Sequence, residues 1–219
     1  MNVGSLFSGI GGIELGFERE GFKTLWFVEN NEYCQKVLRK HWANVPIYGD
    51  IKTVAFRSLP PVDILTGGYP CQPWSKAGKR LGIKDERWLW NDFYKAICIL
   101  RPKYVFMENV PEIVDFGGFS IVLKDLAKIR YDAEWQVIPA SSVGAPHKRE
   151  RIFSVAYPHR KRTKDNKRRT TTSRSSSVDD SVCFGDRVQK EEVFARWHSF
   201  IYSTQWLMGF PIKWTDVGP

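Results

Sequence analysis

The first 157 residues alternate short apolar runs with segments of helical periodicity, and this alternation restricts the fold more than any other feature of the chain. It is typical of α/β domains, in which a largely parallel sheet carries helices on both faces. Arg101-Pro102 and Tyr131-Asp132 are predicted to end the last two helices. Strands are predicted at residues 2–7, 23–28, 62–66, 103–107, 134–140 and 151–156, and helices at 12–20, 31–41, 87–100 and 119–130.

The composition changes abruptly at Pro158, where a basic stretch precedes a run of Ser and Thr. Two interpretations stay open: a solvated linker, or an arm that binds phosphates, and a basic arm can be both. Apolar and aromatic residues return from Val188, and the end of the chain has the pattern of a packed segment. We therefore predict a main α/β domain at 1–157, a small variable appendage that begins with a basic region at 158–200, and a C-terminal segment at 201–219.

Charge and cysteine usage narrow the classes of partner. The formal net charge of +9 and the isoelectric point near 9.4 favour a polyanionic partner such as nucleic acid. The four cysteines form no CxxC pair and the four histidines show no metal-ligand spacing, so neither a disulfide framework nor a metal site is predicted. No apolar run is long enough to span a bilayer and no signal segment precedes the first strand, so we expect a cytoplasmic protein without membrane contact.

The first predicted strand leads into the Gly-rich turn Phe7-Ser8-Gly9-Ile10-Gly11-Gly12, which opens a helix. Glycines there allow a ligand to approach the backbone, although such a turn is weak evidence alone. Glu29 follows at the end of the second strand, where an acidic side chain can bond both hydroxyls of a ribose. Because no pyrophosphate cradle and no GxxxxGK[ST] motif accompany them, a nucleoside without phosphates, such as S-adenosylmethionine, fits better than NAD or ATP.

Asp50 follows the short apolar segment 45–48 and is expected at the same sheet edge as Glu29. Its first interpretation is a helix N-cap, since Asp before a helix is common for that reason alone. Alternatively, it accepts a hydrogen bond from an adenine amino group while Ile51 packs on the ring.

Cys71 lies on a loop framed by Pro and Gly, directly after the apolar run 62–66. A cysteine taken alone is more often a small buried hydrophobe than a nucleophile. Prolines on both sides of Cys71-Gln72 remove two backbone donors and stiffen the loop, which favours a thiol presented to a ligand.

Two further elements carry charged side chains. Glu108 follows four apolar residues at a strand end, where it is either an exposed carboxylate or a proton donor of raised pKa. Arg149 and Arg151 share one face of an entering strand, from which they could hold a phosphate, an ordered loop or a base. Alone, that segment is merely a charged turn.

Taken together and in this order, these elements resemble the DNA cytosine-5 methyltransferase family. The resemblance covers residues 2–157, with a weaker match at 207–215, and implies a Rossmann-like class I S-adenosylmethionine-dependent methyltransferase fold. It also implies that 1–157 is the catalytic and cofactor-binding domain and that 158–200 is a short target-recognition or linker region. His147 stands where the family pattern usually has Gln. The residues that carry the resemblance are Phe7-Ser8-Gly9-Ile10-Gly11-Gly12, Glu29, Asp50, Gly68-Tyr69-Pro70-Cys71-Gln72, Glu108-Asn109-Val110 and Arg149-Glu150-Arg151.

The resemblance also implies roles for individual residues. Cys71 would attack C6 of a flipped-out cytosine, and Glu108 would protonate or bond N3 and the exocyclic amine. Arg151 would help to hold the base, and Arg149 the catalytic loop. The implied S-adenosylmethionine site comprises Phe7, Gly9, Gly11, Gly12, Glu29, Asn30, Asp50, Ile51, Gly68 and Pro70; the implied DNA contacts are Gln72, Ser75, Lys79, Arg80, Arg160, Lys161 and Arg162.

The expected function is therefore methyl transfer from S-adenosylmethionine to C5 of cytosine in duplex DNA, by a monomer that could have a cognate restriction endonuclease. Two alternatives stay open. The chain contains no Gly-Asn segment of the kind that closes the family's cofactor pocket, which would suit a partial DNA-binding homologue that needs a partner for activity. A related branch of the family methylates tRNA, so RNA is the other possible substrate.

Overall fold

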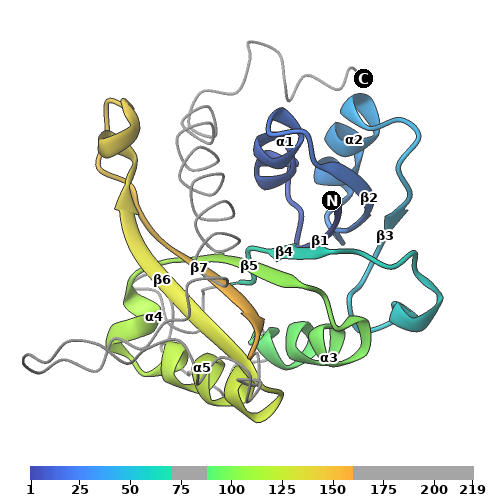
Figure 1. The fold of residues 1–219 in the computed structure, drawn as a ribbon. Coiled ribbons are helices and arrows are strands. Elements are labelled where there is room, and N and C mark those ends of the chain that lie inside the picture. The colour runs from blue at the N-terminus through green and yellow to red at the C-terminus, as the bar shows by residue number, and fades with distance from the viewer. Residues whose placement is uncertain (71–87, 160–219) are drawn as a thin grey trace, which may run out of the picture.

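The computed structural model describes residues 1–70 and 88–159, and all structural statements concern this part of the chain. Its strands form one seven-stranded sheet in the order β3-β2-β1-β4-β5-β7-β6 (Figure 1). The strands are β1 (Asn2–Leu6), β2 (Lys23–Val28), β3 (Ile47–Tyr48), β4 (Ile64–Gly67), β5 (Tyr104–Asn109), β6 (Tyr131–Pro139) and β7 (Glu150–Pro158). The helices are α1 (Gly12–Arg19), α2 (Glu32–His41), α3 (Trp90–Leu100), α4 (Glu112–Asp115) and α5 (Gly118–Lys128), with 3-10 turns η1 (Phe56–Ser58) and η3 (Ala140–Val143).

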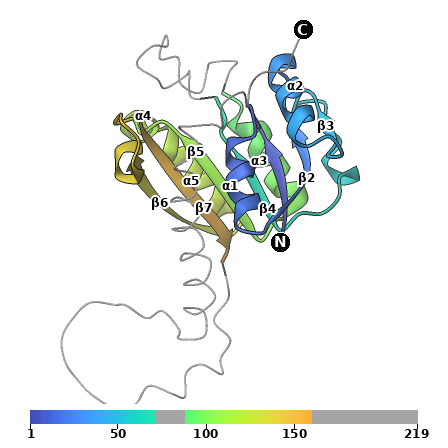
Figure 2. The same ribbon diagram turned by 90° about the horizontal axis from the view of Figure 1, so that it is seen from above.

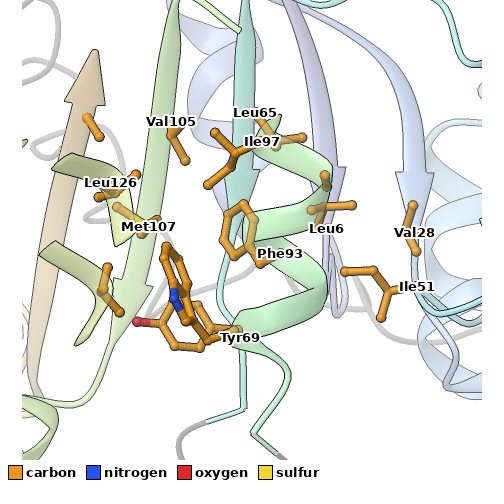
Figure 3. Close-up of a cluster of buried hydrophobic side chains, with 14 of the residues drawn as sticks. Leu6, Val28, Ile51, Leu65, Tyr69, Phe93, Ile97, Val105, Met107 and Leu126 are labelled. Carbon is orange, nitrogen blue, oxygen red and sulfur yellow. The ribbon is translucent and has the colours of Figure 1, made fainter. Parts of the chain in front are cut away.

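Helices cover both faces of the sheet because side chains along each central strand alternate between two apolar layers. Val3 packs with Phe17 of α1, whereas Leu6 packs in the layer of α3 and α5. Figure 1 shows α1 and α2 on one face and α3 and α5 on the other. Figure 3 shows Phe93 and Ile97 of α3 among the apolar side chains of the central strands. The buried strands therefore read as nearly continuous apolar runs, as expected for a sheet covered on both faces.

Strand β7 reverses the direction of the otherwise parallel sheet. It pairs antiparallel with β5 and with β6, whereas β1, β2, β3, β4 and β5 pair in parallel. Because β7 is antiparallel, its first residues lie beside the last residues of β5, and Ile152 pairs with Asn109. The start of β7 therefore reaches the edge at which the parallel strands end, where α/β folds place their ligands. Figure 2 shows the β6–β7 hairpin from above.

Most predicted elements are confirmed, with shifts at their ends. The break at Arg101-Pro102 is confirmed, since Arg101 takes a left-handed conformation with φ of 48° and ends α3. The helix predicted at 119–130 does end before Tyr131-Asp132, but the strand start predicted at 134 is wrong: β6 already begins at Tyr131, which pairs with Pro158. The phenol of Tyr131 donates to the carbonyl of Pro102 at 2.6 Å, and this buried contact fixes the strand start. Helix α4 was not predicted.

Two sets of predictions lie outside the described residues. The appendage at 158–200 falls there except for Pro158 and His159, and the C-terminal segment 201–219 falls there entirely. Among the described residues, no helix is long and apolar enough to cross a membrane.

Candidate active site at the carboxyl edge of the sheet

The Gly-rich turn after β1 adopts the strained backbone that its glycines permit. Gly9 and Gly11 have φ angles of 54° and 83°. A Cβ atom on Gly11 would lie 2.4 Å from the Trp42 ring, so the turn packs directly against α2. Among the described residues, no heavy atom lies within 4 Å of the position that a Cβ atom on Gly9 would take, so they leave this face of the turn open to a ligand. Phe7 also has a positive φ of 54°, and its ring packs edge-on against Phe93.

Glu29 follows β2 and joins two loops through its carboxylate. Oε2 accepts a hydrogen bond from the backbone N–H of Gly9 at 2.7 Å, and Oε1 accepts one from Asn31 at 2.8 Å. The side chain of Gln35 donates to the Glu29 carbonyl at 2.6 Å, and Glu29 is 8% exposed. Each carboxylate oxygen keeps a second lone pair, so a held Glu29 can still accept hydroxyl groups beside the Gly9 turn.

Asp50 caps a turn and not a helix, so its first interpretation as a helix N-cap is wrong. Its Oδ1 accepts from the backbone N–H of Lys52 at 2.9 Å, and its carbonyl accepts from the Thr53 amide and hydroxyl. The side chain of Asp50 is exposed. Ile51 is buried and belongs to the apolar cluster that contains Leu6 and Val28 (Figure 3). Their predicted contacts with an adenine ring stay predictions.

The backbone after β4 is anchored at Tyr69, two residues before Cys71. The Tyr69 ring is 3% exposed and packs against Trp88, Trp90 and Phe93. Burial raises the pKa of its phenol well above the usual range. The side-chain amide of Asn109 donates to the Tyr69 carbonyl at 3.2 Å. The segment that leads to Cys71 therefore leaves the core from a fixed point, and Figure 3 shows Tyr69 at the end toward which β1 and β5 point.

Glu108 and Arg151 form an ion pair between β5 and β7. The Nε atom of Arg151 lies 2.8 Å from Oε1 of Glu108, and both side chains are about three-quarters buried, with 24% and 27% of their surface exposed. A Cβ atom on Gly68 would lie 3.0 Å from Oε2 of Glu108. Glycine at position 68 therefore lets the backbone of the loop that leads to Cys71 approach the carboxyl group closely.

The surroundings of Glu108 raise the pKa of its carboxyl group. Burial is the main cause, and the nearby guanidinium groups of Arg151 and Arg149 oppose it. The raised pKa agrees with the proton-donor interpretation of Glu108. Arg149 itself is exposed, and its carbonyl accepts from Ala140 at 3.1 Å, so of the two arginines only Arg151 forms the ion pair with Glu108.

The other predicted site residues divide into two groups. Gly12 is the first residue of α1 and is buried, Pro70 is half-buried, and Asn30 is exposed. The residues predicted as nucleophile and as DNA contacts lie outside the described part of the chain, and their roles stay predictions: Cys71, Gln72, Ser75, Lys79, Arg80, Arg160, Lys161 and Arg162.

Sequence reasoning missed three side chains or backbone groups at this edge. Asn109 anchors Tyr69, and the Asn31 amide holds Glu29. Glu14 of α1 is completely buried and hydrogen-bonds to Thr66 of β4. Its signal was present in the sequence, because Glu14 precedes the buried Phe17 by three residues and so lies on the apolar face of the predicted helix.

The fold and this edge define the class of protein. A mostly parallel seven-stranded sheet with one reversed strand, covered by helices and carrying a Gly-rich turn beside an acidic strand end, is a Rossmann-like fold of the S-adenosylmethionine-dependent methyltransferase type. A family model described as C-5 cytosine-specific DNA methylase matches residues 1–203. The chain belongs to this family.

Curated relatives agree with the family. The chain is 38% identical over 156 residues to the Type II methyltransferase M.NgoBI of Neisseria gonorrhoeae, with 69% of this chain and 49% of the relative covered. It is also 38% identical over 158 residues to the Type II methyltransferase M.HaeII of Haemophilus aegyptius, with the same coverage. The chain thus spans about half the length of these relatives.

A solved structure supports the fold. The structure of a protein described as a DNA modification methyltransferase, encoded within an E. coli prophage, superposes with a TM-score of 0.61 at 29% identity. The superposition covers 72% of this chain and 47% of that chain.

The residues at the edge fit S-adenosylmethionine, the methyl donor of this class. The open face of Gly9 provides room for a ligand against the backbone, and the Glu29 carboxylate beside it has the chemistry to accept both ribose hydroxyls.

Proposed function

We propose that the protein transfers a methyl group from S-adenosylmethionine to C5 of cytosine in duplex DNA. The observation that supports this most strongly is the Glu108–Arg151 pair, which lies against Gly68 on the loop that leads to Cys71. A carboxyl group of raised pKa beside a partly buried guanidinium can hold and protonate the Watson–Crick edge of a base. Membership of the family supplies the substrate class.

The proposed chemistry begins at Cys71. Its thiolate forms a bond to C6 of the cytosine while the Glu108 carboxyl delivers a proton to N3, which makes C5 an enamine-like carbon. S-adenosylmethionine, when bound, supplies an electrophilic methyl group for that carbon. Loss of the C5 proton to a base, and of the Cys71 sulfur from C6 as the proton on N3 is released, then restores the aromatic ring.

Arg151 and Arg149 act on position and charge in this proposal. Arg151 orients the Glu108 carboxyl through the 2.8 Å contact and stays close enough to contact the base. Arg149, exposed one residue before β7, holds the loop of Cys71. Because C6 cannot be reached inside a duplex, the cytosine must leave the base stack. The proposed DNA contacts are Gln72, Ser75, Lys79, Arg80, Arg160, Lys161 and Arg162.

On the donor side, Glu29 binds the ribose hydroxyls and the Gly9 backbone lies against the ligand. Asp50 is exposed and follows Tyr48, whose carbonyl accepts from the Glu29 backbone N–H at 2.9 Å. It is proposed to accept from the adenine amino group, with Ile51 at the ring. The remaining proposed contacts are Phe7, Gly11, Gly12, Asn30, Gly68 and Pro70.

The proposal includes partners and location. The curated relatives are named Type II methyltransferases, so a cognate restriction endonuclease is a proposed partner of this chain as well. The basic stretch from Arg160 onward supports a nucleic-acid ligand through its charge. We propose a monomer that acts in the cytoplasm.

The test is transfer of a labelled methyl group to duplex DNA and to tRNA, with wild-type protein and the Cys71→Ser variant. The proposal expects label in DNA with the wild type, background label in tRNA, and none with the variant. Label that persists in Cys71→Ser would exclude Cys71 as the nucleophile, and label in tRNA alone would exclude DNA as the substrate. Calorimetry with S-adenosylmethionine separates an enzyme from a DNA-binding homologue without donor affinity.

A further inference from the structure

The fully buried Glu14 lies between the helix that follows the Gly-rich turn and the strand that leads to Cys71. It belongs to α1, the helix that follows the Gly-rich turn, and its Oε1 lies 2.7 Å from the Thr66 hydroxyl of β4. Thr66 is buried and immediately precedes Gly67 and Gly68 on the way to Cys71. Figure 1 shows α1 over β1 and β4. One carboxyl group thus joins the helix of the donor turn to the strand of the nucleophile loop.

A chain of hydroxyl groups continues from this carboxyl toward the turn. Ser5 of β1 is buried, its side chain is close enough to Glu14 to favour the ionised form of that carboxyl, and its hydroxyl donates to Ser8 at 2.7 Å. Ser8 belongs to the Gly-rich turn and lies 3.4 Å from the Val28 carbonyl, one residue before Glu29. The polar chain therefore runs from β4 through α1 and β1 to the turn.

The surroundings of Glu14 favour the neutral, protonated form of its carboxyl group. Burial raises the pKa of Glu14, and the nearby Glu18 raises it further, whereas the hydrogen bonds with Thr66 and Ser5 oppose the shift. The Thr66 hydroxyl donates to Oε1 of Glu14 at 2.7 Å, and the Gly4 carbonyl lies 3.5 Å from the same hydroxyl. Within the described residues Oε2 of Glu14 has no hydrogen-bond partner, and a buried charge without a partner costs more than a neutral carboxyl group there.

We propose that Glu14 is a positioning residue: through Thr66 and Ser5 its carboxyl group holds the Gly-rich turn of the donor site in register with the strand that carries the nucleophile loop. This inference rests on the proposed function, because it assigns the turn to donor binding and the loop to catalysis. Glu14 touches no reacting atom and acts through the backbone on either side. An apolar residue would fill the same space, so packing alone does not require a carboxyl group here.

The experiment compares Glu14→Leu, which fills the space without hydrogen bonds, with Glu14→Gln, which keeps an acceptor for Thr66 and a donor for Ser5. Amide hydrogen exchange of the ligand-free chain is measured for peptides that cover residues 7–12 and 66–70. We expect about tenfold faster exchange in both segments for Glu14→Leu and restored protection for Glu14→Gln, at similar melting temperatures. Affinity for S-adenosylmethionine should fall about tenfold in the Leu variant and recover in the Gln variant.

Two results would overturn the inference: wild-type exchange and donor affinity in Glu14→Leu, or the same loss in Glu14→Gln as in Glu14→Leu. If Glu14→Leu does not fold, Thr66→Val removes the same hydrogen bond at nearly constant shape and carries the same expectations. Hydrogen exchange needs no ligand, so it reports on Glu14 even if the wild-type chain binds no S-adenosylmethionine. Failure of the wild-type chain to bind S-adenosylmethionine would count against the proposed function and not against the role of Glu14.

Discussion

Two halves of the carboxyl edge of the sheet each hold an acidic side chain, in different ways. We call them the donor half and the base half after the roles proposed above. In the donor half, after β1 and β2, both oxygens of Glu29 accept backbone N–H groups from Gly9 and Asn31. In the base half, after β4 and β5, Glu108 faces the guanidinium of Arg151 in surroundings that raise its pKa. The two carboxyl groups thus differ in their partners: backbone amides fix Glu29 as an acceptor, whereas burial raises the pKa of Glu108 and favours its protonated form.

The largest effect is expected from Glu108→Gln. The amide keeps the shape and can still hydrogen-bond but cannot deliver a proton, so methyl transfer should fall by about 10²–10⁴-fold. Donor affinity, measured by calorimetry, should stay unchanged because Glu29 is untouched. Asp115→Asn is the matched control, since that carboxylate is exposed on α4. An unchanged transfer rate in Glu108→Gln would remove the distinction between the halves.

Glu29→Gln should give the opposite pattern. One amide oxygen cannot accept from both Gly9 and Asn31, and the lost acceptor is also unavailable to a ribose hydroxyl, so donor affinity should fall about 10–100-fold. The transfer rate at saturating donor should change far less. Glu32→Gln, an exposed carboxylate three residues later, is the control. Equal losses of affinity in both variants would show that Glu29 has no specific role.

The pH dependence of the methyl-transfer rate should reveal the effect of Arg151 on Glu108. If the protonated form of Glu108 donates the proton, as proposed, its raised pKa predicts that the transfer rate falls as pH rises through a value above the ordinary 4.5. Arg151 favours the ionised carboxylate, so Arg151→Met should raise the pKa of Glu108 further and move this decline to higher pH. Rates at saturating donor, measured across pH for both proteins, provide the check. A shift toward lower pH would contradict the assignment.

The smallest effect is expected at the opposite edge. Lys103 pairs with Asp63 at 2.7 Å and lowers the pKa of that carboxyl group, but the Lys103 side chain is 72% exposed. Solvent screens such pairs, so Lys103→Met should leave the melting temperature, donor affinity and transfer rate within error of the wild type. A clear loss of transfer would mean that function is not confined to the carboxyl edge.

Much of the donor half could be predicted from local sequence. The glycines and Glu29 lie at spacings that reflect a turn and a strand end, and both features depend on residues close together in the chain. The base half could be predicted only as single candidates, because Glu108 and Arg151 meet through the pairing of β5 with β7. The antiparallel direction of β7 makes that contact, and apolar periodicity does not reveal strand direction.

Side-chain hydrogen bonds over long sequence separations could not be predicted. The contacts of Asn109 with Tyr69 and of Glu14 with Thr66 depend on which strands become neighbours. Asp50 shows the opposite kind of error. The preference of Asp for helix N-caps suggested a helix after it, whereas the chain forms a turn there. A charged residue on an apolar helix face, as at Glu14, was the one signal that local analysis could have used.

Bisulfite sequencing of DNA from cells that express the wild-type chain or Cys71→Ser tests the central claim most directly. We expect protected cytosines in one sequence context with the wild type and none with the variant, because the thiol is required for attack at C6. Protection at equal levels in both, or in neither under conditions where both chains are folded, would contradict the account.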